Sequence, residues 1–502
     1  MKAGPDEQAT IVVGGGLGGL AAACTLAARG RRVQLFERRS TVGGKAAQLE
    51  DEGYRFDMGP TILTLPSVLR RIWSEAGLEL EQDLELVRLD PQWRCFYSDG
   101  ATLDLVADED AMVRKLEAFA PGSGAGYRRF MERSARLHDI SRRYYFWRSV
   151  GRTLDMFRLR DMLRPGTLAD LVALSPSQTV ASMVRGYVPE PRVAQMLDHF
   201  TQYVGSCPDS SPAVLCGIAD MQTGEGVWYP RGGIGAVPAA LERLARRLGV
   251  ELHCDAEVTA VRHSEGRIRS VEVDGRTIEA EAVVVNADAV LAGERLLEPP
   301  GPLPANRFEP ACSGVVLYLG LNRRYPQLLH HNFVFSKSPE EEFEAIYGRG
   351  EPAPDPTCYV CAPAATDPEV APEGGEALYV LAHTPWLRDG QDWSQLLPEQ
   401  RERILDKLEQ QAGLEGLRDA IVVEHHLTPA DIAERYQVWR GAIYGVASHG
   451  RLTGAIKVPN QSPTIAGLAF AGGAAHPGPG MPMVLMSGWI AADALTPAAV
   501  PG

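Results

Sequence analysis

Residues 10–23 read Thr10-Ile11-Val12-Val13-Gly14-Gly15-Gly16-Leu17-Gly18-Gly19-Leu20-Ala21-Ala22-Ala23, and they determine the first unit of the fold. The β-branched residues at the start favour a strand, and the Ala- and Leu-rich residues after the glycines favour a helix that ends near Ala28. A second apolar run, residues 33–36, ends on Glu37. The order strand, glycine turn, helix and strand is typical of a dinucleotide-binding βαβ unit.

Each glycine of this G-x-G-x-x-G pattern has its own mechanical role. Gly14 allows the tight turn out of the strand, Gly16 lets a pyrophosphate approach the backbone, and Gly19 lets the helix pack closely on the strand. Gly18 lies in the same turn, where the free N–H groups and the helix dipole favour phosphate. The carboxylate of Glu37 can accept hydrogen bonds from both ribose hydroxyls. We therefore predict a dinucleotide site that disfavours the 2′-phosphate of NADP.

The bulk composition limits the classes of function. With 502 residues, 45% of them hydrophobic, the chain can bury a large core and divide into two or three domains. A formal net charge of −14 argues against nucleic acid as a partner. The apolar run over residues 11–28 contains five glycines, so the strand–turn–helix interpretation explains it better than a membrane span. The polar first residues do not resemble a signal peptide, and we expect a cytoplasmic protein.

The cysteines and histidines give no strong metal signature. Eight cysteines are too few for a disulfide scaffold in a chain of this length. Cys358-Tyr359-Val360-Cys361 has C-x-x-C spacing, but it looks like a strand and has no second pair, so we expect structural cysteines. The pairs His330-His331 and His425-His426 are predicted to point to opposite faces of a strand and not to chelate. We therefore expect no metal site.

A second group of motifs follows the βαβ unit. Residues 43–46 read Gly43-Gly44-Lys45-Ala46, and residues 57–62 read Asp57-Met58-Gly59-Pro60-Thr61-Ile62. Two glycine turns with a nearby cation suit a second phosphate contact. Together with the first motif, this pattern resembles the flavin amine oxidase superfamily, and its GP-T ending is closest to carotenoid desaturases of the phytoene desaturase type. That family usually has Arg where this chain has Lys45, which keeps the charge but loses bidentate geometry.

The C-terminal motif strengthens the resemblance. Residues 472–488 contain G-x-x-x-H-P-G-x-G-x-P followed by Ser-Gly, which resembles the C-terminal flavin signature of bacterial-type carotenoid desaturases. Ala475 stands where Thr is usual, and Met481 and Met483 stand where small or branched residues are frequent. We expect these differences to change the shape of the pocket. His476 is expected to be mainly structural.

The middle of the chain also matches the family. The block Trp228-Tyr229-Pro230-Arg231-Gly232-Gly233 is characteristic of carotenoid desaturases. The resemblance implies that the backbone of Val258 meets the adenine and that the chain returns to the cofactor at Asn286. Elsewhere, apolar patterns predict strands over residues 313–321, 359–362 and 377–383 and helices over residues 236–248 and 398–412.

The resemblance covers essentially the whole chain and implies an α/β fold. Residues 1–75, 225–300 and 450–502 would form a discontinuous, three-layer, Rossmann-like FAD-binding domain. Residues 76–224 and 301–449 would form a mixed α+β substrate domain with a helical part. FAD would be held without a covalent bond, at Gly14, Gly16, Gly18, Gly19, Glu37, Arg38, Gly44, Lys45, Gly59, Pro60, Thr61, Ile62, Val258, Asn286, Gly472, Gly473, Met481, Pro482 and Met483.

The implied activity is the FAD-dependent removal of hydrogen from C–C bonds of a long isoprenoid such as phytoene. Such a substrate has no polar handles, so recognition must rest on an apolar tunnel and its shape. The sequence assigns no catalytic residue and no proton acceptor. It also leaves open the terminal electron acceptor, the number of desaturation steps and the oligomeric state, including a homo-oligomer.

Residues 127–164 are a candidate membrane-docking segment. They contain eleven arginines and four acidic residues, interleaved with Tyr144-Tyr145-Phe146-Trp147 and further apolar side chains. A basic, aromatic-rich amphipathic segment suits an anionic lipid surface, which predicts peripheral association with the inner membrane. The alternative is a charged helix whose apolar face packs in the core.

Three other functions remain open at this point. The first is a related carotenoid enzyme: a 3,4-desaturase, a C30 desaturase or a terminal carotenoid oxidase. The second is a flavin amine oxidase, which would need a polar amine site with an aromatic cage. The third is a non-catalytic prenyl-binding protein that resembles the GDP-dissociation inhibitor fold and binds no flavin.

Overall fold

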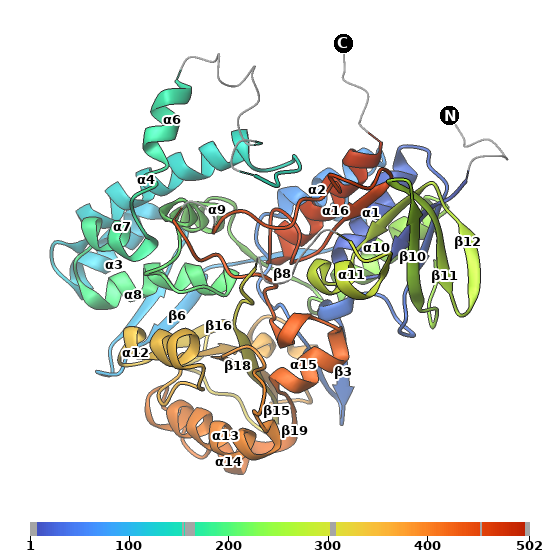
Figure 1. Ribbon diagram of the computed structural model, residues 1–502. Helices are drawn as coiled ribbons and strands as arrows, with labels where there is room; N and C mark the ends of the chain where they lie inside the picture. Colours follow the sequence, from blue (N-terminus) through green and yellow to red (C-terminus); the bar gives the residue numbers. More distant parts are fainter. Residues whose placement is uncertain (1–7, 153–154, 156–165, 302–307, 452–453, 497–502) are drawn as a thin grey trace.

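A five-stranded parallel sheet forms the centre of the first half of the fold (Figure 1). The computed structural model describes residues 8–152, 155, 166–301, 308–451 and 454–496. The strand order is β20-β13-β1-β2-β9. Apart from the edge strand β9, the strands are mostly apolar and buried, because both faces of a parallel sheet are covered. They are β1 (Thr10–Val13), β2 (Val33–Phe36), β9 (Glu251–His253), β13 (Ala282–Val285) and β20 (Leu468–Phe470).

Two different layers cover the faces of this sheet. Val12 packs in one core with helices α1, α2, α10 and α16, whereas its neighbours Ile11 and Val13 pack against the mixed four-stranded sheet β12-β11-β10-β14. The predicted three-layer, Rossmann-like architecture is therefore confirmed. The covering elements are α1 (Leu17–Ala28), α2 (Pro66–Glu75), α10 (Ala236–Arg247), α16 (Met481–Leu495), β10 (Val258–Ser264), β11 (Arg267–Val273), β12 (Arg276–Glu279) and β14 (Leu297–Glu298).

Helices α1 and α16 approach each other at glycines. A Cβ added to Gly488 in α16 would overlap the carbonyl oxygen of Gly18 in α1. A Cβ added to Gly19 would overlap the carbonyl oxygen of Gly14, which confirms the packing role predicted for this third glycine. Backbone contact at this distance leaves no room for any side chain.

A mixed seven-stranded sheet forms the second half of the fold, in the order β19-β15-β18-β17-β16-β6-β7. The predicted strands are confirmed as β15 (Ser313–Leu321), β17 (Cys358–Cys361) and β18 (Glu376–Thr384). The other four strands are β6 (Trp93–Phe96), β7 (Thr102–Leu105), β16 (His331–Val334) and β19 (Ile421–Leu427). Two short ladders join β3 (Gln48–Asp51) to β4 (Tyr54–Asp57) and β5 (Leu86–Leu89) to β8 (Val227–Pro230).

Helices cover both faces of this second sheet (Figure 1). On one face, Phe333 and Tyr379 share a core with a helical layer, and on the other face Leu317 packs under α13. The helical layer comprises α3 (Glu109–Phe119), α4 (Ser123–Tyr144), α6 (Thr167–Ala173), α7 (Val180–Tyr187), α8 (Pro191–Asp198) and α9 (Gly217–Glu225). The remaining helices are α11 (Ala289–Arg295), α12 (Pro339–Phe343), α13 (Trp393–Gln410), α14 (Leu417–Ala420) and α15 (Pro429–Tyr436).

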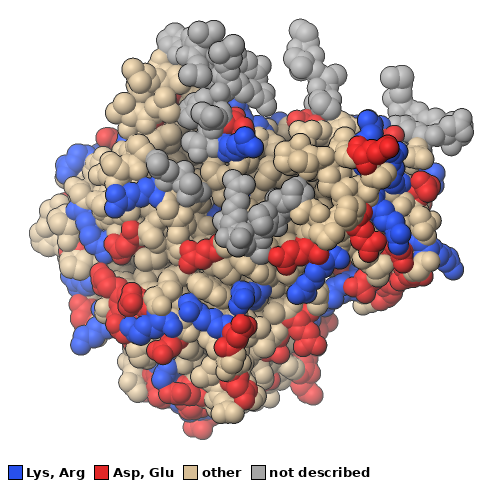
Figure 2. Space-filling view, in the orientation of Figure 1, with Lys and Arg blue, Asp and Glu red and all other residues tan. Residues whose placement is uncertain are grey.

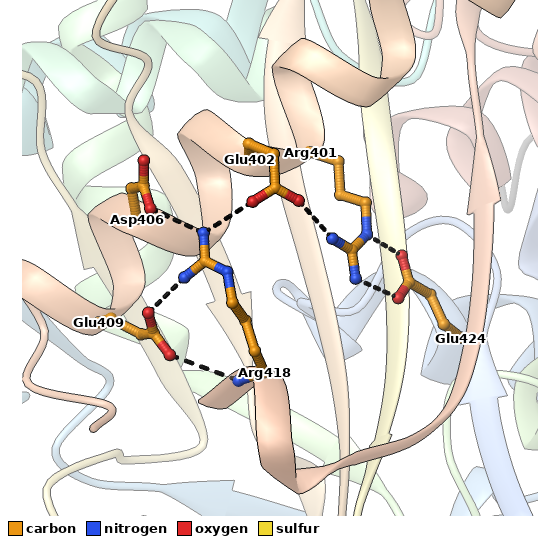
Figure 3. Close-up of polar contacts among 6 residues, drawn as sticks. All are labelled: Arg401, Glu402, Asp406, Glu409, Arg418 and Glu424. Carbon is orange, nitrogen blue, oxygen red and sulfur yellow. Dashed lines mark hydrogen bonds and ion pairs between the residues drawn. The ribbon is translucent and has the colours of Figure 1, made fainter. Parts of the chain in front are cut away.

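A network of ion pairs ties α13 to the sheet (Figure 3). Arg401 of α13 donates two hydrogen bonds to Glu424 of β19, at 2.6 and 2.7 Å. Arg418 of α14 contacts Glu402 and two further acidic residues of α13, Asp406 and Glu409. Bidentate and networked pairs hold geometry better than isolated surface pairs, so α13 is a fixed outer layer.

The segment predicted to dock on a membrane packs mostly against the protein. Phe146 packs in the core of the dinucleotide half and is only 6% exposed. The ring of Trp147 packs edge-on against that of Trp489, with 5.3 Å between the ring centroids. Burial withdraws Phe146 from any lipid surface, and Trp147 is half-buried, so neither ring is a freely exposed docking residue. Among the arginines, Arg136 and Arg143 pair with buried Asp170. Residues 153–154 and 156–164 of the segment lie outside the described residues.

None of the helices in the described part of the chain combines the length and the apolar character that crossing a bilayer requires.

The glycine contact between α1 and α16 generates the first prediction. We expect Gly488→Ala to lower the free energy of unfolding by about 3 kcal/mol, because its Cβ would overlap a backbone oxygen that cannot move freely. Urea denaturation followed by circular dichroism would measure this change. The matched control is Gly186→Ala at an exposed position of α7, where nothing lies within 4 Å of the added Cβ and helix propensity rises. Equal stability of the two variants would contradict the packing argument.

Candidate functional site

One large cavity joins the two halves of the molecule. Its volume is about 1060 Å³, and it begins at the carboxyl ends of the parallel strands, beside Val13, Phe36 and Asn286. It continues between the helical layer and the seven-stranded sheet, where Ile218 and Phe333 line it. In open α/β sheets, ligands bind outside the carboxyl ends of the strands, so the first end of the cavity is where a dinucleotide is expected.

The glycine turn forms the floor of this first end. Gly14 has φ +95°, and Gly16 is the N-cap of α1 and has no side chain to cap the helix. Asn286 holds the turn, because its backbone N–H donates to Val13 O at 2.9 Å and its Nδ2 donates to Gly14 O at 3.1 Å. Gly14, Gly16 and Asn286 line the cavity as predicted. Gly18 is not among its described lining residues, and it acts through helix packing, as does Gly19.

Glu37 is held in a fixed orientation at the end of β2. Its Oε2 accepts a hydrogen bond from the Gly15 N–H at 2.7 Å, and its Oε1 accepts one from the Arg39 N–H at 3.0 Å. The Glu37 side chain is buried. It lines the cavity together with Arg38 and with Val258, the first residue of β10. Each carboxylate oxygen keeps a lone pair for a further donor, such as a ribose hydroxyl. The geometry therefore fits the role predicted for Glu37.

The Gly43-Gly44-Lys45 turn packs directly on the glycine turn. The Gly43 N–H donates to Gly15 O at 2.8 Å, and both Gly43 and Gly44 have positive φ. Lys45 is held below this turn, where its Nζ donates to Ile443 O at 2.9 Å. Burial lowers the pKa of Lys45 to about 8, and the nearby Asp288 carboxylate partly opposes this shift. A bound anion would raise the pKa of this lysine again and so stabilise its charged form, because an opposite charge favours protonation.

Residues 59–62 form one wall near the middle of the cavity. Gly59 has no room for a side chain, because an added Cβ would overlap the carbonyl oxygen of Lys45. Thr61 Oγ1 lies 2.6 Å from the hydroxyl of Tyr359, which belongs to β17 of the second sheet. Gly59, Pro60, Thr61 and Ile62 all line the cavity. This loop therefore joins the dinucleotide end to the second sheet.

The N-terminus of α16 forms the opposite wall. Its N-cap is Gly480, which offers no side-chain cap, and Pro482 occupies the first turn. A proline fits there because its missing N–H needs no partner in the first turn. The uncapped N–H groups and the helix dipole face the cavity, where they favour negative charge. The lining residues here include five of the predicted set: Gly472, Gly473, Met481, Pro482 and Met483.

The three residues of the C-terminal motif that differ from the usual family pattern lie in different places. Met481 and Met483 line the cavity, where their side chains are placed to affect its shape. Ala475 is fully buried and is not among the described lining residues. His476 is also buried, and its Nε2 lies 2.9 Å from Tyr145 O. Burial lowers the pKa of His476 to about 4, which fits its expected structural role.

The far end of the cavity contains residues that sequence reasoning missed. His199 and His383 line it, and burial lowers their pKa values to about 3 and 4, so both imidazoles are neutral near pH 7. Lys457 also lines the cavity, beside the Gly478 turn before α16, and its Nζ donates to Val446 O at 2.8 Å and to Ser448 Oγ at 2.7 Å. Burial lowers the pKa of Lys457 to about 7. These residues come from separate segments with no local motif, so only the tertiary structure brings them together.

The residues at the first end fit a dinucleotide cofactor. Two helix N-termini without side-chain caps face the same space, and glycine at positions 14 and 16 leaves that space open. A bound pyrophosphate can approach such a backbone, and Glu37 is placed for a ribose. The described residues therefore supply the donor set that the sequence predicts for FAD.

Comparisons with known proteins agree with this geometry. The family model described as flavin containing amine oxidoreductase matches residues 17–496. The chain is 38% identical to a 4,4'-diapolycopene oxygenase of Methylomonas sp, over 97% of this chain and 98% of the relative. It is 35% identical to a zeta-carotene-forming phytoene desaturase of Myxococcus xanthus, over 99% and 95% of the two chains.

Solved structures share the fold at much lower sequence identity. An oxidoreductase from Methanosarcina mazei superposes with a TM-score of 0.64 at 18% identity, covering 96% of this chain and 99% of that one. A putrescine oxidase bound to putrescine superposes with a TM-score of 0.62 at 16% identity, covering 97% and 98% of the two chains. These likenesses establish the fold.

The orientation of Glu37 generates the second prediction. We expect Glu37→Ala to raise the Kd for FAD at least tenfold, because the loss of a charge-assisted hydrogen bond costs about 1.5–3 kcal/mol. Flavin absorbance after ultrafiltration would measure the retained cofactor. Glu279→Ala, an exposed acid on β12, is the matched control and should keep the wild-type occupancy. Full occupancy in Glu37→Ala would show that another residue holds the ribose.

Proposed function

The chain belongs to the flavin-containing amine oxidoreductase family, and we propose that this FAD-dependent oxidoreductase oxidises a long, apolar isoprenoid of the carotenoid type. The observation that carries the proposal is one cavity of about 1060 Å³ that runs from the dinucleotide cradle to the space between the helical layer and the second sheet. Its volume lies at the upper end of the usual range of about 300–1,000 Å³ for ligand sites, and the cradle takes up only one end. The remaining space is suited to a second, elongated molecule.

The far part of this cavity has the chemistry of an apolar tunnel. Its walls are mainly aliphatic and aromatic side chains from the helical layer and the second sheet, and the imidazoles of His199 and His383 among them are neutral. A hydrocarbon gains binding energy there in proportion to the buried area and needs no hydrogen-bond partner. The residues that supply these walls include Ile140, Leu171, Leu174, Val214, Leu215, Ile218, Val316, Phe333, Leu381, Leu427 and Ile432.

The distribution of carboxylates argues against an amine substrate. Among the described residues that line the cavity, the acidic ones are Glu37, Glu257 and Asp288, all from segments at the dinucleotide end. Asp288 already accepts hydrogen bonds as the N-cap of α11. A charged amine in the far part would therefore lose its hydration without gaining a counter-charge, which is costly.

FAD, when bound, supplies the acceptor for two electrons and a hydrogen. The protein positions the polyene and excludes water from the reacting carbons, which an apolar, enclosed wall does well. The loop 59–62 and the N-terminus of α16 both line the cavity between the dinucleotide cradle and the apolar part, where the two molecules would meet. Within the chain, these two elements would set the orientation of the substrate.

Two reactions on the same kind of substrate fit this geometry. In the first, each step removes a pair of hydrogens from neighbouring carbons, as the name of the Myxococcus relative implies for that protein. In the second, a terminal carbon gains oxygen, as the names of the oxygenases from Methylomonas and Staphylococcus haemolyticus imply for those proteins. We favour desaturation as the first candidate and terminal oxidation as the second, and their products differ in mass.

Expression in cells that make phytoene, and separately in cells that make C30 or already desaturated carotenoids, would test the proposal. We expect products that lack hydrogen pairs, whereas products that carry added oxygen would establish the second candidate. Chromatography with mass spectrometry distinguishes the two. A purified, flavin-loaded protein that changes none of these substrates would contradict the proposal.

Blocking the tunnel provides an independent test. We expect Ile218→Trp, in α9, to lower product formation at least tenfold while FAD occupancy stays unchanged, because a larger side chain fills the apolar part of the cavity. Ile218→Leu keeps the volume and is the matched control. Equal activity of both variants would show that the substrate does not occupy this part of the cavity.

A lipid-soluble substrate must enter the cavity from a membrane, and helix α6 carries our candidate docking surface. It takes the place of the aromatic residues 144–147. Leu168, Leu171 and Val172 are 76%, 38% and 71% exposed and share one face of the helix at i, i+3 and i+4 spacing. Leu171 and the following Leu174 also line the cavity. In Figure 1, α6 projects from the helical layer, and its visible surface in Figure 2 is mainly uncharged. An apolar surface at the cavity supports transfer of a lipid-soluble substrate.

We expect the double variant Leu168→Ser with Val172→Ser to lower the fraction bound to anionic liposomes by about tenfold, because two exposed apolar side chains no longer enter the lipid. Co-sedimentation would measure the bound fraction. Val422→Ser on β19, where Val422 is 54% exposed, is the matched control and should bind as the wild type does. Unchanged binding of the double variant would remove α6 from the docking surface.

A further inference from the structure

The histidine pair at residues 330–331 and the C-x-x-C run at residues 358–361 meet in the second sheet. The antiparallel pairing of β16 with β17 places His331 directly opposite Cys361. His330 precedes the first residue of β16, and its ring centroid lies 4.5 Å from that of His331. The prediction that these two histidines point apart is therefore wrong, because strand alternation does not apply to a residue before the strand. Cys358, at the other end of β17, packs in the core on the opposite face of the sheet.

The three side chains form a compact, buried group. One ligand atom from each of His330, His331 and Cys361 lies within 4.8 Å of the others. The three residues are 6%, 1% and 3% exposed. Directly opposed residues of an antiparallel pair project to the same face of the sheet, so the backbone itself holds His331 and Cys361 together.

The hydrogen bonds of the histidines leave one nitrogen of each ring available. His330 Nδ1 lies 2.7 Å from the hydroxyl of Thr366, and His331 Nδ1 lies 2.8 Å from the hydroxyl of Tyr359. Both Nε2 atoms are buried and have no hydrogen-bond partner among the described residues. Buried polar atoms in proteins are normally satisfied, so two such atoms in one cluster require an explanation.

We propose that His330, His331 and Cys361 form a buried binding site for a thiophilic divalent metal ion, with Zn²⁺ as the reference ion. Imidazole nitrogen and thiolate sulfur are the ligands that zinc prefers. The bonds from Nδ1 to Thr366 and Tyr359 are the outer contacts that orient metal-bound histidines. The free Nε2 atoms become the metal ligands, which accounts for their lack of any other partner.

A small void borders the sulfur end of the cluster. Its volume is about 10 Å³, and Cys361, Asp57 and Tyr229 are among the residues that line it. This is about the smallest space that holds a water molecule. Zinc sites with three protein ligands take a water as the fourth.

The site has a mechanical consequence for the large cavity. Tyr359 contacts His331 Nδ1 on one side and Thr61 Oγ1 on the other. Thr61 belongs to the loop 59–62 that lines the cavity. A bound metal fixes His331 and, through Tyr359, supports the contact between the second sheet and this loop. The inference does not depend on the identity of the substrate.

Metal analysis of the full-length, flavin-loaded protein tests the proposal. The protein is expressed in zinc-supplemented medium and passed over a chelating resin. We expect elemental mass spectrometry to find one zinc ion per chain. X-ray absorption at the zinc edge should show one sulfur at about 2.3 Å and two nitrogens at about 2.0–2.1 Å. This second measurement uses the unaltered protein and so does not depend on the folding of any variant.

Two variants and one control assign the site. We expect Cys361→Ser and His331→Gln to lose the bound zinc and to unfold at a lower temperature than the wild type. Cys358→Ser changes a buried cysteine of the same strand on the opposite face, and it should keep the zinc. The proposal is overturned if the wild-type protein, dialysed against micromolar Zn²⁺, holds none. It is also overturned if zinc stays bound in both variants, or if absorption shows no sulfur ligand.

Discussion

The fold depends on a single close approach of three backbone segments around the first glycine turn. A Cβ at Gly18 would lie 2.5 Å from Asn286 Oδ1 and 3.0 Å from the Gly472 N–H. These contacts bring together the start of the chain, the end of β13 and the turn before α16, which are far apart in sequence. Any side chain at this point would separate the segments, and the wall of the cavity would open. Glycine is therefore required here for packing as much as for ligand approach.

This contact also separates the polar end of the cavity from its apolar end. It aims the N-termini of α1 and α16 into one space, so the charged and dipolar groups that suit a dinucleotide gather at one end. The far end is built from the helical layer and the second sheet, whose alternating residues present apolar side chains to it. A flavin enzyme with a hydrocarbon substrate needs this separation, because polar groups in the tunnel would gain no partner from the substrate.

The segment 127–164 and the histidine pair show how local patterns mislead. The amphipathic pattern of α4 is real, but its apolar face, including Phe130 and Leu137, packs in the core shared with the second sheet. Periodicity shows that one face is buried and does not say whether protein or lipid covers it. In the same way, the alternation rule for strands failed at His330 because it depends on where a strand begins, and boundaries are the least certain part of sequence interpretation.

The amino-acid sequence by itself determined the βαβ unit, the acidic residue at Glu37, the glycine-rich loops and the strands β15, β17 and β18. These features are local, because glycine geometry, hydrophobic periodicity and motif spacing act over a few residues. Only the tertiary structure decided which residues surround the far end of the cavity, which helix presents an apolar face, and that His331 opposes Cys361. Those relations join segments hundreds of positions apart or pair separate strands. They are set by packing and register, which no single stretch of sequence encodes.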